Sequence, residues 1–146
     1  MEHESPAGWR MAMLSHVGRV RARNEDFVFC DEVLGIAVLA DGMGGHAGGN
    51  VAARLAVDAW VGRIRKCLVE PLGERDLRVA VADANRVVFA AACADPALRR
   101  MGTTLVAACF RRDDTLLTCN VGDSRLYRLR GDVLSCLTRD HSVLRA

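Results

Sequence analysis

Apolar and polar residues alternate along several short stretches near the N-terminus, and this two-residue period predicts half-buried β-strands. We expect one strand at residues 10–16, and two more at 26–30 and 34–41 with a turn at 32–35 between them. Because this link is so short, the last two strands are expected to pair as an antiparallel hairpin. Residues 1–8 show no such pattern and are expected to form a flexible tail.

The hydrophobic period lengthens in the middle of the chain. From Asn50 to Leu68 and from Glu74 to Cys93, apolar residues recur every three or four positions, which predicts two amphipathic helices. Trp60 and Ile64 lie on the apolar stripe of the first helix and are expected to be buried. The alternating pattern then returns, and further strands are expected at residues 103–110, 116–121, 124–129 and 133–137.

The order of strands, two helices and strands again indicates an α+β fold, with the helices packed antiparallel on one face of a sheet. The 146 residues are 51% hydrophobic and 26% charged, as in ordinary folded domains, and we expect one domain over residues 9–146. The net charge is only +2, and the basic residues are scattered without interleaved aromatic ones, so no nucleic-acid partner is expected.

Hydropathy and cysteine spacing bear on the cellular compartment. No apolar run reaches the roughly 18 residues of a membrane span, and the N-terminus lacks the basic and apolar regions of a signal peptide. These features predict a cytoplasmic protein with no membrane association. The six cysteines form no Cys-x-x-Cys pair and are expected to be reduced and buried: Cys30, Cys67, Cys93, Cys109, Cys119 and Cys136.

A possible cation site lies where the second strand of the hairpin ends. The apolar run of residues 36–40 stops at Asp41, and five glycines follow within the eight residues 42–49. An aspartate followed by Gly42 offers a carboxylate and a backbone carbonyl, both of which suit a hard cation. Glu25 and Asp26 open the preceding strand, so the hairpin brings them to the same end of the sheet, where their negative charges favour a bound cation.

Four ordered segments with distinctive residues extend over most of the chain. The segments are Gly18-Arg19-Val20-Arg21-Ala22-Arg23-Asn24-Glu25-Asp26, Asp41-Gly42-Met43-Gly44-Gly45-His46, Met101-Gly102-Thr103-Thr104, and Asn120-Val121-Gly122-Asp123-Ser124-Arg125 with Leu137-Thr138-Arg139-Asp140-His141-Ser142 after it. They resemble the signature motifs of bacterial metal-dependent serine/threonine phosphatases of the PP2C (PPM) family, and the chain resembles the N-terminal portion of that domain.

The resemblance implies an α-β-β-α sandwich, in which helices flank two antiparallel sheets, and it implies roles for individual residues. Asp41 matches the aspartate that bridges two Mn²⁺ or Mg²⁺ ions, and Gly42 matches the glycine whose carbonyl binds one of them. Glu25 and Asp26 match the acidic pair at that same ion. Arg21 matches the arginine that binds the substrate phosphate, and Asp123 matches a ligand of a weaker third ion.

The activity implied by this resemblance is hydrolysis of phosphoserine and phosphothreonine in proteins by a metal-activated water, with Asp41 and Arg21 as the catalytic residues. A serine/threonine kinase is the implied functional counterpart. The family has two further metal-binding aspartates beyond the position of Ser142, and the 146 residues include no equivalent. We therefore expect a domain that is incomplete at its C-terminus, with reduced metal affinity.

Two alternatives to an active phosphatase remain open from the sequence. The chain could be a catalytically impaired remnant, or pseudophosphatase, that only binds a phosphoprotein or another partner. A nucleotide-binding loop at residues 42–49 is the weaker alternative, because the loop lacks a Lys-Ser/Thr ending. The role of His46 is also open: a histidine here could serve as a general acid, but Met43 occupies the position of the histidine in eukaryotic family members.

Overall fold

The N-terminal hairpin forms from two strands joined by a tight turn. In the computed structural model, which describes residues 9–44, 48–67 and 72–141, strand β1 is Asp26–Asp31 and strand β2 is Ile36–Met43. The Asp31 carboxylate accepts hydrogen bonds from the backbone N–H groups of Val33 and Leu34, at 3.1 and 3.0 Å. Such a side chain stabilises a turn locally, so the hairpin predicted from the short link is confirmed.

The hairpin is part of a larger antiparallel sheet in the order β1-β2-β4-β5. Strand β4 is Leu105–Phe110 and strand β5 is Leu116–Val121, while the two-residue strand β3, Gly102–Thr103, pairs with the end of β2. A separate two-stranded sheet contains β6, Tyr127–Arg130, and β7, Val133–Cys136. The α+β class with two antiparallel sheets is thus confirmed.

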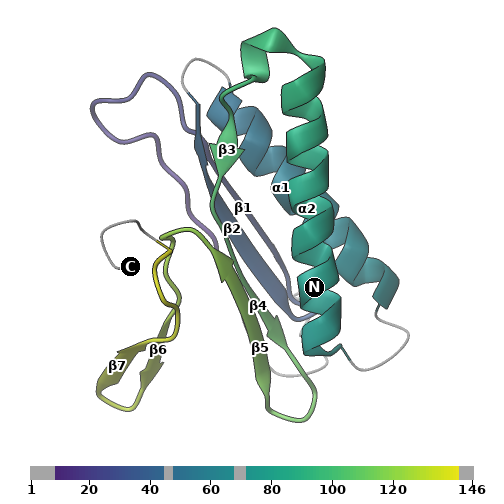
Figure 1. Ribbon diagram of the computed structural model, residues 1–146. Helices are drawn as coiled ribbons and strands as arrows, with labels where there is room; N and C mark the ends of the chain where they lie inside the picture. The colour runs from purple at the N-terminus through teal and green to yellow at the C-terminus, as the bar shows by residue number, and fades with distance from the viewer. Residues whose placement is uncertain (1–8, 45–47, 68–71, 142–146) are drawn as a thin grey trace, which may run out of the picture.

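Two long helices cover one face of the large sheet. Helix α1 is Gly48–Cys67 and helix α2 is Glu74–Ala94, followed by a short 3₁₀ helix η1 at Pro96–Leu98. The two helices run antiparallel, side by side, while β6 and β7 lie away from them beyond the sheet (Figure 1). At the start of α2 the Gly73 N–H donates to the Asp76 carboxylate at 2.9 Å, which satisfies a backbone group that a helix start leaves unpaired.

The hydrophobic core lies between the helices and the sheet. Trp60 and Ile64 are 0% exposed, as the helical period predicted. The sheet contributes its helix-facing side chains, which alternate along each strand and include Ile36, Val38, Ala40, Leu105, Ala107 and Cys109. Among the described residues, no helix combines the length and apolar character needed to cross a membrane.

Two expectations from the sequence are wrong. Residues 10–16 form no strand, because they pair with no strand of the sheet, and Leu14 is 90% exposed. Instead, this segment is attached to the β1–β2 turn by the Trp9 indole N–H and the Met11 N–H, which donate to Glu32. The second error concerns the cysteines, since Cys93 and Cys136 are exposed.

The thiols that do lie in the core are shielded from water. Burial raises the pKa of Cys109 to about 12 and that of Cys119 to about 11, which keeps both thiols protonated and unreactive near neutral pH. The indole N–H of Trp60 lies next to the Cys119 sulfur and lowers that pKa slightly, although its geometry falls short of a regular hydrogen bond.

Replacing Trp60 by alanine should lower the free energy of unfolding by about 3–5 kcal/mol, because it leaves a large cavity under α1. Phe89→Ala is the matched control: Phe89 lies on α2 and is 68% exposed, so its truncation should change stability by less than about 0.5 kcal/mol. Urea denaturation of both variants measures the difference. Equal losses for the two would mean that Trp60 is not the centre of the core.

Candidate metal and phosphate site

Two aspartates face each other where the hairpin ends. Asp26 is the first residue of β1, and it is paired directly with Asp41 of β2 in the antiparallel register. Directly paired residues project from the same face of a sheet. The helix-facing positions of β1 and β2 include Phe27 and Ala40, so the two aspartates project from the opposite face, away from the core. The two aspartates therefore lie together at the end of the hairpin, as expected for this part of the acidic cluster.

The electrostatics of Asp41 reflect this close approach. Partial burial of its carboxyl group raises the pKa of Asp41, and the charge of Asp26 and a hydrogen bond shared with it raise that pKa further. Asp41 as a whole is nevertheless exposed, so the site is open to solvent. Arg21 lowers the pKa of Asp41 and Asp123 raises it, which places both of these charges near the aspartate pair. Two carboxylates this close need a proton or a cation between them.

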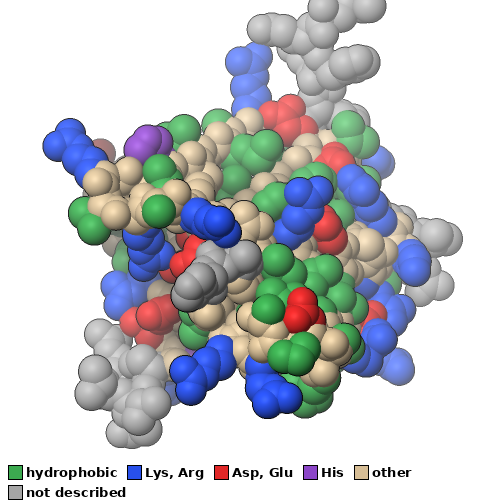
Figure 2. Space-filling model, turned by 90° about the horizontal axis from the view of Figure 1, so that it is seen from above, with side chains coloured by type: hydrophobic (Ala, Val, Ile, Leu, Met, Phe, Trp, Pro, Cys, Tyr) green, Lys and Arg blue, Asp and Glu red, His purple; other side chains and the backbone are tan. Residues whose placement is uncertain are grey.

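Arg21 lies in the exposed segment that precedes β1. Its guanidinium is 4.0 Å from the Glu25 carboxylate and its side chain is 66% exposed, so most of its donors face solvent. In the view from above, basic side chains lie among acidic ones over this end of the molecule (Figure 2). Arg21 is therefore a cation beside the aspartate pair that remains accessible to an anionic ligand.

Glu25 lies at the same end of the sheet but on the side of the helices. Its carbonyl accepts a hydrogen bond of 3.1 Å from the Gly42 N–H, which extends the hairpin pairing by one residue. Its carboxylate packs against Gly49 in the first turn of α1, and the atom Oε1 is buried without a hydrogen-bond partner. The positive end of the α1 dipole favours a carboxylate there.

Gly42 and Gly49 lie so close together that neither tolerates a side chain. A Cβ on Gly42 would overlap the carbonyl group of Gly49. A Cβ on Gly49 would lie 2.5 Å from Glu25 Oε1 and 2.9 Å from the Gly42 carbonyl carbon. The glycines after Asp41 thus allow α1 to begin directly against the end of the hairpin.

The turn that contains Asp123 is fastened to the same region. Gly122 has a φ of +95°, and its Cα packs against Thr104, where a Cβ would lie 2.7 Å from the threonine methyl. The hydroxyl of Ser124 is 2.7 Å from that of Thr104. Because the Thr104 hydroxyl also bonds to the Asp41 N–H, it connects the end of β2 to the turn after β5.

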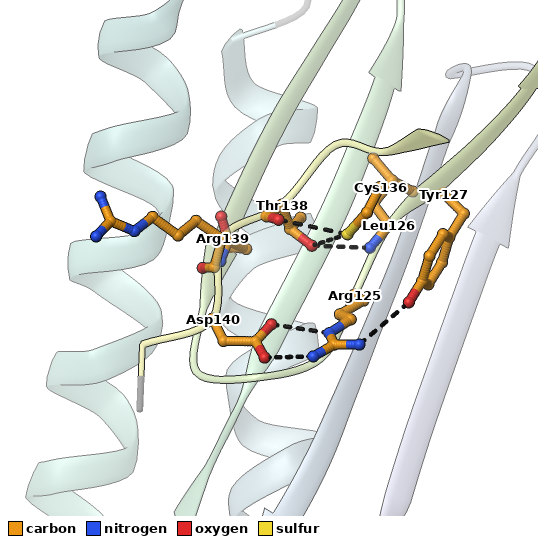
Figure 3. Close-up of polar contacts among 8 residues, drawn as sticks. Arg125, Leu126, Tyr127, Cys136, Thr138, Arg139 and Asp140 are labelled. Carbon is orange, nitrogen blue, oxygen red and sulfur yellow. Dashed lines mark hydrogen bonds and ion pairs between the residues drawn. The ribbon is translucent and has the colours of Figure 1, made fainter. Parts of the chain in front are cut away.

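A bidentate ion pair holds the next part of the chain in place. The Arg125 guanidinium donates to both carboxylate oxygens of Asp140, at 2.9 and 2.6 Å, and also to the Tyr127 hydroxyl (Figure 3). The N–H of His141 donates to the Gly122 carbonyl at 3.0 Å. These contacts hold residues 138–141 against the turn that contains Asp123, and they restrict the conformation of that turn.

The donor set fits a divalent cation only in part. Within residues 9–44, 48–67 and 72–141, no three Asp, Glu, His or Cys side chains are close enough together to form a metal site by themselves. What the described residues offer is the carboxylate pair of Asp26 and Asp41 with the adjacent Gly42 carbonyl. That set fits one hard cation whose remaining oxygens come from water or from other groups.

Comparison with known proteins identifies the family of this chain. Residues 15–143 match the family model described as protein phosphatase 2C. The chain belongs to the protein phosphatase 2C family. The matched range includes the four motifs on which the resemblance rests.

Relatives and solved structures extend the comparison. The serine/threonine phosphatase stp of Listeria innocua is 40% identical over 134 residues, which cover 87% of this chain and 52% of that protein. The crystal structure of the Mycobacterium tuberculosis phosphatase PstP matches with a TM-score of 0.79 at 36% identity, over 90% of this chain and 54% of the other.

A structure of the PstP catalytic domain in complex with two manganese ions matches with a TM-score of 0.78 at 38% identity, over 90% of this chain and 55% of the other. The chain spans about half the length of the Listeria relatives.

The structure adds two features that the sequence did not single out. The Thr104 hydroxyl bonds directly to the backbone of Asp41, and Arg125 pairs with Asp140. The sequence signal for this ion pair is an arginine in the segment 120–125 and an aspartate in the next segment, 137–142. His46, whose role was open, lies outside the described residues.

Gly49→Ala should lower the free energy of unfolding by about 1–3 kcal/mol, since the added methyl meets the backbone of Gly42 as well as the Glu25 carboxylate. Gly62→Ala is the matched control on α1, because a Cβ there meets no atom within 4 Å. That control should gain up to about 1 kcal/mol from helix propensity. Chemical denaturation measures both, and a neutral Gly49→Ala would contradict the close approach of α1 to the hairpin.

Proposed function

We propose that this chain supplies the cation- and phosphate-binding part of a metal-dependent serine/threonine phosphatase. The observation that carries the proposal is the pairing of Asp26 with Asp41 at the open end of the β1–β2 hairpin. A purely structural pair of aspartates would be unfavourable there, because the two charges repel and neither contributes to the core. Membership of the protein phosphatase 2C family supports the same function.

In this proposal the cations are Mn²⁺ or Mg²⁺, with a central pair and a weaker third ion. Asp41 and Asp26 hold the central ions together with the Gly42 carbonyl, Glu25 contributes from the helix side, and Asp123 holds the third. The relative PstP has been crystallised with two manganese ions, which supports the central pair. Bound divalent cations lower the pKa of water and offset the charge of phosphoryl oxygens.

The chain's own residues prepare the site for this chemistry. Arg21 binds the substrate phosphate through two parallel N–H donors, which its exposure leaves free. The antiparallel pairing fixes the spacing of the two aspartates before any ligand arrives. The proposed substrates are phosphoserine and phosphothreonine in proteins, as the names of the relatives suggest, and the exposure of Asp41 and Arg21 leaves room for a segment of polypeptide. A serine/threonine kinase that makes these phosphoesters is the functional counterpart.

The ligand count limits what residues 1–146 do alone. A hard divalent cation binds about six oxygens, whereas no three acidic, His or Cys side chains of the described residues lie close enough together to hold one ion. We therefore expect this chain by itself to bind Mn²⁺ weakly and to hydrolyse phosphoesters slowly.

Joined to the part of the Listeria innocua phosphatase that it does not cover, the chain should hydrolyse a phosphothreonine peptide in the presence of Mn²⁺. Asp41→Asn should reduce the rate to background, because it removes a cation ligand while the side-chain volume stays the same. Asp132→Asn, on the exposed β6–β7 turn, is the matched control and should leave the rate unchanged. Phosphate release at increasing Mn²⁺ concentration measures all three proteins.

Hydrolysis that does not depend on Mn²⁺, or that survives Asp41→Asn, would contradict the proposed function. A protein that binds the phosphopeptide in an Arg21-dependent way without hydrolysing it would instead favour the non-catalytic alternative.

A further inference from the structure

The pairing between β2 and its neighbour is interrupted opposite Asp41. Strands β3 and β4 would form one continuous strand, as expected for residues 103–110, but they are separated at Thr104. At this position the Asp41 N–H donates to the Thr104 side-chain Oγ1 at 3.0 Å rather than to a backbone carbonyl. The Thr104 N–H still donates to the Asp41 carbonyl at 2.9 Å. Thr104 therefore binds both backbone groups of Asp41.

The Thr104 hydroxyl has a second partner on the other side. Its oxygen is 2.7 Å from Ser124 Oγ, and either hydroxyl can be the donor of this bond, so Thr104 Oγ1 bonds both to the Asp41 N–H and to Ser124. The Thr103 hydroxyl lies 2.9 Å from the displaced Thr104 carbonyl and 3.1 Å from the Asp41 carbonyl, so its one hydrogen is available to both acceptors. Thr104 is 4% exposed, and it is the polar residue that is buried among those that the structure describes. A buried hydroxyl with both bonds made is held in one orientation.

We propose that Thr104 is a positioning residue, whose buried hydroxyl sets the orientation of Asp41 and couples it to the Asp123 turn through Ser124. The inference rests on the proposed function, since Asp41 and Asp123 are cation ligands only there. Physically, the bond from Thr104 fixes the backbone from which the Asp41 carboxylate projects. The bond to Ser124 fixes the residue next to Asp123. The Thr104 hydroxyl therefore sets the position of Asp41, at the end of β2, relative to Asp123, in the turn after β5.

Residue size alone does not explain this arrangement. Valine has nearly the shape of threonine and would fill the same space against Gly122, but it would leave the Asp41 N–H without its acceptor. Serine would keep the hydroxyl and lose only the methyl. The two substitutions therefore separate the hydrogen bonds from packing.

The test measures Mn²⁺ affinity of the full 146-residue chain by electron paramagnetic resonance, with Asp41→Asn as the control that defines site-specific binding. Thr104→Val should weaken Asp41-dependent Mn²⁺ binding roughly tenfold, the scale of loss when a group supporting a metal ligand is removed. Thr104→Ser should bind close to the unmodified chain. Ser124→Ala should weaken binding less than Thr104→Val, because it leaves the bond to Asp41 in place.

A second, metal-free measurement follows the Asp41 amide by hydrogen exchange in NMR. Thr104→Val should speed this exchange roughly tenfold, and Thr104→Ser should restore protection. Unchanged Mn²⁺ affinity in Thr104→Val, or equal losses in the valine and serine variants, would overturn the positioning role. If Thr104→Val does not fold, Ser124→Ala becomes the deciding variant. Unchanged Mn²⁺ affinity in Ser124→Ala would overturn the proposed coupling of Asp41 to the Asp123 turn.

Failure of the proposed function is distinguishable from these outcomes. An unmodified chain with no Asp41-dependent Mn²⁺ binding would overturn the proposed function and the positioning role together. Asp41-dependent binding that is indifferent to Thr104 would overturn the positioning role alone.

Discussion

The candidate site depends on the pairing of Asp26 with Asp41, two acidic residues placed opposite each other at the end of a hairpin. Each of the surrounding features bears on this pair. The hairpin sets its spacing, the glycines let α1 begin beside it, and Thr104 holds the backbone of one member. A repulsive contact that several favourable contacts hold in place is typical of a binding site. The local loss of stability is offset when a ligand of opposite charge binds.

The two faces of the large sheet have different roles, since one forms the hydrophobic core and the other carries the candidate site. The face toward α1 and α2 is apolar and contains the core around Trp60. The opposite face carries Asp26 and Asp41 at the paired ends of β1 and β2. Because side chains alternate along a strand, neighbouring residues such as Glu25 and Asp26 serve different sides. This explains why Glu25 contacts the start of α1 while Asp26 faces Asp41.

Local patterns in the sequence predicted the features that depend on local physics. The helices followed from the apolar period around Trp60, and the meeting of Asp26 and Asp41 followed from a short turn that leaves little freedom of register. Residues 10–16 show where this fails, since alternation predicts a strand only when a partner strand is available. The Thr104 bond to Asp41 joins residues 63 positions apart, and no local pattern encodes a side chain that replaces a carbonyl in a sheet.

Anomalous diffraction at the manganese absorption edge, from crystals of this chain soaked in Mn²⁺, tests the central claim most directly. The account predicts a peak between the carboxylates of Asp26 and Asp41, within bonding distance of both, which disappears in the Asp41→Asn variant. Manganese bound elsewhere, with the two carboxylates left in contact with each other, would contradict it.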